Sequence, residues 1–224
     1  MEKVIAALWA PDAAVRERLP ERLRAAGASR IRLNLRDAGV EAGARHVQRW
    51  REPDAVAQFW LASANPRFFA PAASALGEAS GRFAAWLVAE ATIIPNTAHP
   101  PQPGARTEGW SQATFLAFRP DLDPETADAH WRTHHTTVAI ETQANFEYVQ
   151  NRVVRALTPN APAYDAFVEE CFPLEALTDP KAFFDAVGDE AKYQANLATM
   201  MDSCSGFIDF SRIDVIPTSQ YDFA

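Results

Sequence analysis

Residues 95–109 read PNTAHPPQPGARTEG and contain four prolines and two glycines. Proline fixes φ and removes a backbone N–H donor, so neither a helix nor a central strand is expected to run through this stretch. It therefore predicts a linker over residues 96–109, with one domain at residues 1–95 and a second at residues 110–224. The length of 224 residues is sufficient for two small domains, each with its own core.

The two halves show the same order of predicted elements, strand–helix–strand–strand–helix–strand, from apolar runs, alternation and capping residues. The predicted strands cover residues 3–10, 31–35, 55–62, 83–94, 110–118, 146–157, 164–172 and 207–216, and the predicted helices cover 12–26, 68–78, 124–143 and 180–201. This order is the split βαβ pattern of a ferredoxin-like fold. The fold class we predict is α+β, with two ferredoxin-like βαββαβ repeats fused into a pseudo-dimer. Their sheets would bury their bare faces against each other and enclose a lumen.

Composition narrows the class of protein. The chain is 48% hydrophobic and 22% charged, with a formal net charge of −8, which argues against nucleic acid as a partner. No apolar run reaches the roughly 18 residues of a membrane span, so no membrane partner is expected. Two cysteines, Cys171 and Cys204, are too few for a disulfide framework. We therefore expect a cytoplasmic protein.

Three of the five histidines fall on one predicted helix, as His130, His134 and His135. Helical spacing places His135 on a stripe with Trp131 and Val138, facing the sheet. An inward histidine suits proton transfer near neutral pH, so His135 is the candidate general acid or base. The alternative is a core histidine bonded to a backbone carbonyl.

Metal and cofactor chemistry find less support. The i, i+4 spacing of His130 and His134 would allow two imidazoles to share an ion, but a third ligand, such as Glu147 or Glu169, would have to come from another element. An exposed histidine pair is the favoured interpretation, so no metal is predicted. There is no G-x-S-x-G elbow and no glycine-rich phosphate loop. We therefore predict no cofactor.

The predicted strand 146–157 is the second candidate element. Alternation puts Tyr148, Gln150 and Arg152 on one face, and the valine-rich face on the other. We expect the valine-rich face to pack against helices and the Tyr148 face to line the lumen, where it would bind a ligand. The alternative is that Gln150 and Arg152 reach solvent at the barrel rim.

The segments WRTHHTTV (131–138) and FEYVQNRV (146–153) together resemble the EthD-type motif of the dimeric α+β barrel superfamily. Trp131 and His135 take the positions of the family's tryptophan and histidine, four residues apart. The segment beginning at Tyr148, which includes Gln150 and Asn151, matches the family's strand. Thr137 departs from the pattern, since relatives often have proline soon after the histidine. The resemblance covers about residues 110–220 and implies a fused pseudo-dimer with one surviving site.

The resemblance implies a cofactor-independent enzyme of the lyase (decarboxylase), cyclase or isomerase type, acting on an aromatic or carbonyl-containing small molecule. His135 would be the general acid or base, and His134 a supporting proton carrier. The substrate-binding residues would be Trp131, Tyr148, Gln150, Asn151 and Arg152. Two alternatives stay open: a non-catalytic binding or accessory protein of a degradation or biosynthesis pathway, and a haem- or metal-binding barrel. A homodimer through the outer helices is also compatible with the sequence.

Overall fold

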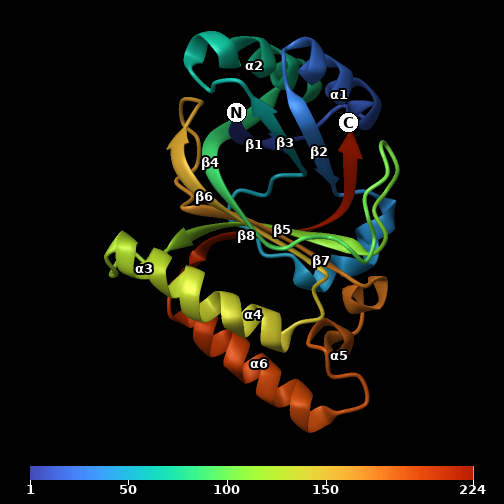
Figure 1. The fold of residues 1–224 in the computed structure, drawn as a ribbon, viewed down its shortest axis with the longest axis vertical. Coiled ribbons are helices and arrows are strands. Elements are labelled where there is room, and N and C mark those ends of the chain that lie inside the picture. Colours follow the sequence, from blue (N-terminus) through green and yellow to red (C-terminus); the bar gives the residue numbers. More distant parts are fainter. Residues whose placement is uncertain (224) are drawn as a thin grey trace.

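Eight antiparallel strands close into a barrel in the computed structural model, which describes residues 1–223 (Figure 1). Around the barrel the strands follow the order β1-β3-β2-β8-β5-β7-β6-β4. The first half contains β1 (Glu2–Trp9), α1 (Val15–Ala25), β2 (Ser29–Leu35), the 3₁₀ helix η1 (Ala38–His46), β3 (Ala55–Leu61), α2 (Pro66–Ser80) and β4 (Arg82–Ile94). The second contains β5 (Trp110–Phe118), α3 (Pro124–His130), the π turn η2 (Trp131–His135), α4 (Thr136–Thr142), β6 (Glu147–Ala156), β7 (Ala166–Phe172), the 3₁₀ helix η3 (Leu174–Leu177), α5 (Pro180–Phe183), α6 (Glu190–Ser205) and β8 (Ile208–Phe223). The predicted mixed α+β fold is confirmed.

Helices α2, α3 and α5 begin where the sequence places a polar cap before a proline. Asn65 accepts a hydrogen bond from the backbone N–H of Arg67 at the start of α2, and Asp123 and Asp179 cap α3 and α5 in the same way. Proline at the first helical position costs no hydrogen bond, because that N–H has no partner within the helix. The predicted helix over 124–143 is interrupted by the π turn η2, which lies between α3 and α4.

The last strand is longer than the sequence predicts. The sequence predicts that this strand ends at Ile216, just before Pro217, but β8 continues to Phe223. Its first part pairs with β5, and its last residues pair with β2 of the first half. The other junction between the halves is the pairing of β4 with β6. The part of β8 that follows Pro217 therefore joins the two halves and closes the barrel.

Helices cover the barrel on two opposite sides (Figure 1). Helices α1 and α2 pack on the strands of the first half through a continuous apolar core that includes Leu19, Leu23, Phe69 and Leu76. Helices α3, α4 and α6 lie on the other side, over the strands of the second half. The candidate site lies under this second helix layer, as described below.

Large side chains fill one end of the barrel, and the prediction that Tyr148 lines the lumen is wrong, because Tyr148 packs with the helix layer outside the barrel. At one end, large side chains from both halves pack together, and the indole of Trp86 lies 5.4 Å from the rings of both Phe115 and Tyr164. These rings occupy the space because inward side chains alternate along each strand and those at this end are bulky. Toward the other end the inward side chains are polar and charged.

A single guanidinium holds the charged end together. Arg32 Nη1 lies 2.7 Å from a carboxylate oxygen of Glu147 and 2.9 Å from one of Glu169, while its Nε donates to Asp222 at 2.9 Å. Burial alone would raise the pKa of Glu169, but the charge of Arg32 and hydrogen bonds from three amide side chains hold it below its usual value. Those amides belong to Gln220, Asn34 and Gln58.

The two faces of β6 are assigned the wrong way round by the sequence. Gln150 donates to Thr136 Oγ1 at the start of α4, so the Tyr148 and Gln150 face meets the helices. Val149, Asn151 and Val153 therefore point into the barrel, where Val153 packs against the aromatic cluster. Alternation identifies which residues share a face, but it does not determine which face meets the helices.

Replacing Arg32 with leucine should destabilise the protein by about 3–5 kcal/mol, because Glu147 and Glu169 would be left buried without a cation. Urea unfolding followed by circular dichroism measures the effect. Arg49→Leu, which removes an exposed pair with Glu52, is the control and should change the unfolding midpoint little. Equal midpoints for the two variants would show that the Arg32 pairs do not hold the barrel together.

Candidate active site

A cavity of about 390 Å³ lies between the sheet of the second half and its helices. Strands β5, β7 and β8 form one wall, and η2, α5 and α6 form the opposite wall. Most of the lining is apolar or aromatic, including Leu116, Trp131, Val168, Phe183, Phe184 and Met200. The polar side chains are few, as is usual for a small-molecule pocket.

His135 lines this cavity from the π turn η2. Its Nδ1 lies 3.0 Å from Ser203 Oγ on α6, and its ring packs on Phe207 with the ring centres 4.8 Å apart. Burial, with smaller contributions from the charges of His130 and His134, lowers the pKa of His135 to about 4. The imidazole is therefore neutral at neutral pH. Within residues 1–223 its Nε2 has no hydrogen-bond partner, which leaves this atom available to a bound molecule.

Trp131, Tyr148 and Gln150 form a layer beside the π turn. Trp131 is fully buried at the cavity wall. The Gln150 amide donates to Tyr148 Oη at 2.7 Å and to Thr136 Oγ1 at 2.8 Å. Burial and the nearby charge of Glu170 raise the pKa of Tyr148. Tyr148 and Gln150 are absent from the lining, so their contacts brace the helix that carries His135.

The other sequence-derived candidates lie away from the cavity. His134 is exposed at the surface, with its ring centre 4.9 Å from that of His130. Arg152 pairs with Asp128 on α3 at 3.2 Å and also reaches Asp165. Asn151 is completely buried on the opposite face of the sheet, inside the barrel. The structure therefore brings only Trp131 and His135 to the cavity wall.

Glu170 on β7 is the functional candidate that sequence reasoning missed. It is buried, lines the cavity and accepts a hydrogen bond from Asn145 Nδ2 at 3.0 Å. Burial raises the pKa of Glu170 to about 7, against the opposing effect of hydrogen bonds from Asn145 and Gln112. The available signal was a glutamate pair within an apolar strand, where Glu170 shares a face with Val168.

Three further polar atoms in the wall lack partners. Thr114 Oγ1, Trp131 Nε1 and Gln143 Oε1 are buried and make no hydrogen bond within the described residues, and all three side chains line the cavity. Buried polar atoms are nearly always paired in folded proteins. A polar group on a bound molecule, or an ordered water, would satisfy them.

The first half closes one side of the cavity. Arg45 and His46, at the end of η1, both contribute to the lining. The ring of His46 lies 4.8 Å from that of Trp110, and its Nε2 lies 3.2 Å from the carbonyl oxygen of Leu177. Burial and the charge of Arg45 lower the pKa of His46. The site is therefore assembled from both halves of the chain.

No metal centre is formed by the candidates from the sequence. Among residues 1–223 there is no group of three or more His, Cys, Asp and Glu side chains placed to hold an ion. His130 Nε2 lies 3.1 Å from the carbonyl oxygen of Ser203. Glu147 and Glu169, the suggested third ligands, are held by Arg32 inside the barrel.

A closed antiparallel barrel with one helix layer on each side, and a tryptophan–histidine pair over one sheet, defines a protein of the dimeric α+β barrel type. Residues 119–211 match the family model of the EthD domain, and this segment contains the motifs at Trp131–His135 and Tyr148–Asn151. A search of curated proteins found no significant match.

One solved structure supports the fold, and a second aligns with a lower score. An anthrone oxidase-like protein aligns with a TM-score of 0.55 and 10% identity, over 99% of this chain and 92% of the other. A candidate monooxygenase from Lactobacillus acidophilus aligns with a TM-score of 0.49 and 11% identity, over 100% of this chain and 95% of the other. Among residues 1–223, no helix is both long and apolar enough to span a bilayer.

We predict that the His135 imidazole titrates with a midpoint near pH 4, because burial disfavours its charged form. Two-dimensional NMR of the histidine ring nitrogens across the acid range measures this midpoint, and the His135→Gln spectrum assigns the signal. A midpoint between pH 6 and 7, close to that of an unperturbed imidazole, would contradict the burial of the ring.

Proposed function

We propose that this protein is a small-molecule enzyme of the lyase or isomerase type that moves a proton on an aromatic or carbonyl-containing substrate. The observation that carries the proposal is that an ionisable carboxyl group, Glu170, and an imidazole, His135, both line one largely apolar cavity of about 390 Å³. Buried acid–base groups with displaced pKa values are typical of catalytic sites.

The two groups take different roles in this proposal. Glu170 is the general base, since a pKa of about 7 suits proton abstraction at neutral pH. His135 acts as a neutral imidazole: the Ser203 hydroxyl donates to Nδ1, which leaves an Nε2–H to donate a hydrogen bond to a developing oxyanion. In this proposal Glu170 takes the general-base role that the sequence assigned to His135, and His135 stabilises the oxyanion instead.

The side chains that line the cavity favour an uncharged, flat substrate. Trp131, Phe183 and Phe184 supply aromatic surface, while Thr114 and Gln143 offer unpaired polar atoms. Such a lining binds a ring system with one or two oxygen substituents. We propose a carbonyl or phenol oxygen as the group that His135 contacts.

We further infer that the chain is a pair of ferredoxin-like repeats at residues 1–95 and 110–224, joined by the linker 96–109. This inference is supported by the pairing order, because in each half the first strand lies between the third and the fourth. The space under α1 and α2 is occupied by a continuous core, which supports a single site in the second repeat.

A second candidate function is cofactor-free oxygenation of an acidic phenol or anthrone, favoured by the structural likeness to an anthrone oxidase-like protein. The first step, deprotonation of the substrate, would use the same base. Measuring dissolved oxygen during turnover separates the two, because a lyase or isomerase consumes none.

Glu170→Gln should lower kcat/KM by about 10²–10⁴-fold and remove the rise in rate with pH that we expect of the wild type around pH 7. The sign follows from the proposed role, because the base must be deprotonated and becomes so as the pH rises through its pKa. Turnover of a panel of phenols and aromatic ketones, followed by chromatography and mass spectrometry, provides the assay. Exposed Glu175→Gln is the matched control.

His135→Gln should lower kcat by about 10²–10³-fold, the usual effect of losing one oxyanion donor, with a smaller effect on KM. His134→Gln should leave both values close to the wild type, because His134 is exposed and outside the cavity. Unchanged turnover in folded His135→Gln removes this residue from the mechanism.

Ligand retention without turnover would favour an accessory binding function, and an absorption band from a bound haem would favour a haem protein.

A further inference from the structure

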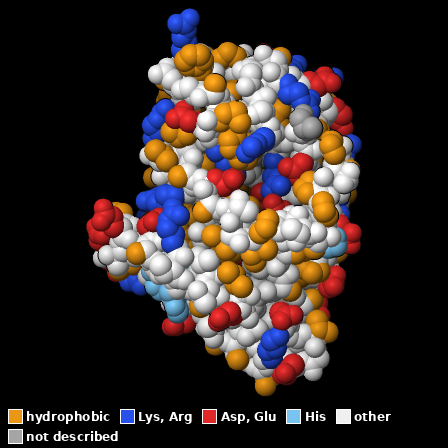
Figure 2. Space-filling model, viewed as in Figure 1, with side chains coloured by type: hydrophobic (Ala, Val, Ile, Leu, Met, Phe, Trp, Pro, Cys, Tyr) orange, Lys and Arg blue, Asp and Glu red, His pale blue; other side chains and the backbone are white. Residues whose placement is uncertain are grey.

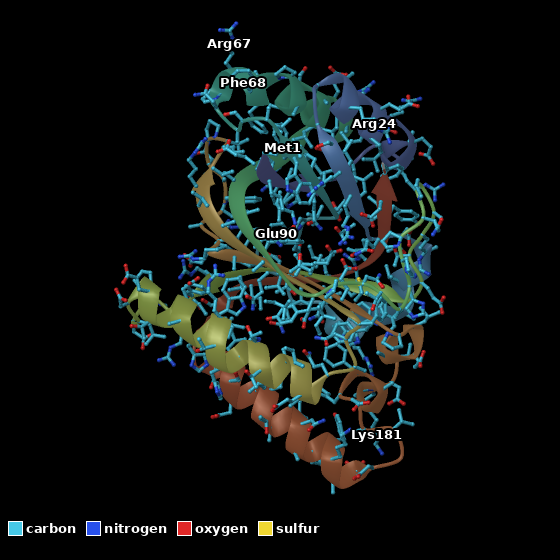
Figure 3. The ribbon with its side chains drawn as sticks, viewed as in Figure 1. Met1, Arg24, Arg67, Phe68, Glu90 and Lys181 are labelled. Carbon is cyan, nitrogen blue, oxygen red and sulfur yellow. The ribbon has the colours of Figure 1, made fainter. Side chains whose placement is uncertain are left out.

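A second cavity, of about 330 Å³, opens at the charged end of the barrel. Its wall includes Lys3, Arg32, Gln58, Glu90, Glu147 and Asp222, which come from six different strands. Acidic and basic side chains gather in the middle of the face shown in Figure 2, and Figure 3 labels Glu90 near the middle of the same view. The cavity lies on the inner face of the sheet, whereas the candidate active site lies on the outer face.

Acidic groups outnumber basic groups at this cavity. The carboxylates are Glu90, Glu147 and Asp222 in the wall, with Glu169 bound to the same Arg32 guanidinium. The inward cations are Lys3 and Arg32, so four negative and two positive charges give a formal balance of −2. The exposed Arg30 at the rim, stacked 5.8 Å from the ring centre of Trp60, brings this balance to −1.

Both inward cations are already paired. Lys3 Nζ lies 2.5 Å from Glu90, and Arg32 contacts three carboxylates. An anion entering the cavity would meet Glu90 and Asp222 without a free cation of its own among the inward groups. The charge pattern therefore disfavours an anionic ligand.

Unpaired hydrogen-bond acceptors also favour a ligand that donates hydrogen bonds. Asp222 Oδ2 and Gln220 Oε1 are buried and make no hydrogen bond within the described residues. The Gln220 amide nitrogen is already used, donating to Glu147 at 3.1 Å and to Glu169 at 2.9 Å. Asn151, also inside the barrel, leaves both side-chain atoms unpaired. Of these three residues, Asp222 lines the cavity, so a ligand that donates a hydrogen bond to its carboxylate would satisfy an acceptor in the wall.

We propose that the mouth of the barrel binds a small organic cation bearing N–H donors, such as a primary ammonium or guanidinium compound. Its charged head donates to Asp222, and its aliphatic part lies against Val149 and Trp60 in the same wall. Trp60 provides an aromatic surface that already attracts cations, with Lys3 Nζ 4.8 Å from its ring centre.

Isothermal titration calorimetry of the full chain at pH 7.5 tests the proposal with four probes: agmatine, butylammonium, tetramethylammonium and acetate. We expect saturable binding of agmatine and butylammonium. Tetramethylammonium, which has the charge but no N–H donor, should bind at least about tenfold more weakly, the loss of one charge-assisted hydrogen bond. Acetate should not bind. No saturable binding of either amine up to about 10 mM would overturn the proposal and leave a cavity filled by water.

Two variants locate the site. Asp222→Asn removes the acceptor charge, and Thr92→Lys adds a cation at an exposed wall position; each should weaken agmatine binding at least about tenfold. Asp209→Asn, on β8 but outside the cavity, should bind like the wild type. Because Thr92 is exposed, its variant tests the site even if Asp222→Asn unfolds. Unchanged agmatine binding in folded Thr92→Lys would overturn the assignment to this cavity.

Discussion

The Arg32 guanidinium is the contact on which the barrel depends. It projects from β2 of the first half and binds carboxylates on β6, β7 and β8 of the second. A buried charge destabilises the folded state unless its partners of opposite charge are present. If the two halves separated or shifted register, Arg32 and its carboxylates would lose these partners or become exposed to solvent. The backbone pairings β2–β8 and β4–β6 close the barrel around the same group.

Glu169 and Glu170 show how this single sheet maintains two environments. The two residues are adjacent on β7, so their side chains point to opposite faces. Glu169 meets Arg32 and three amides, which hold its pKa below the usual value although it is fully buried. Glu170 meets a largely apolar cavity with no ion-pair partner among the described residues, and burial raises its pKa to about 7. The inner glutamate therefore stays charged and structural, while the outer one can exchange a proton near neutral pH.

Local sequence signals predicted most of the strands and helices and placed Trp131 and His135 on one face of a helix, because caps, prolines and helical spacing act over a few residues. The orientation of β6 could not be predicted, since two faces of similar polarity differ only in what the rest of the chain packs against them. The packing at one end of the barrel depends on side chains such as Trp86 and Phe115, which meet only after both halves fold. Glu170 was missed for a related reason: its environment is created by α5 and α6, far along the chain.

Burial acts in opposite directions on the two groups proposed to share the chemistry. It lowers the pKa of His135 and raises that of Glu170, so both lose charge as water is excluded. At neutral pH the cavity therefore holds a neutral imidazole and a carboxyl group close to its midpoint. Such a site suits an uncharged substrate, because the first charge separation occurs only when the proton moves. The π turn serves this arrangement, since it directs the His135 ring to Ser203 and keeps Nε2 open to the cavity.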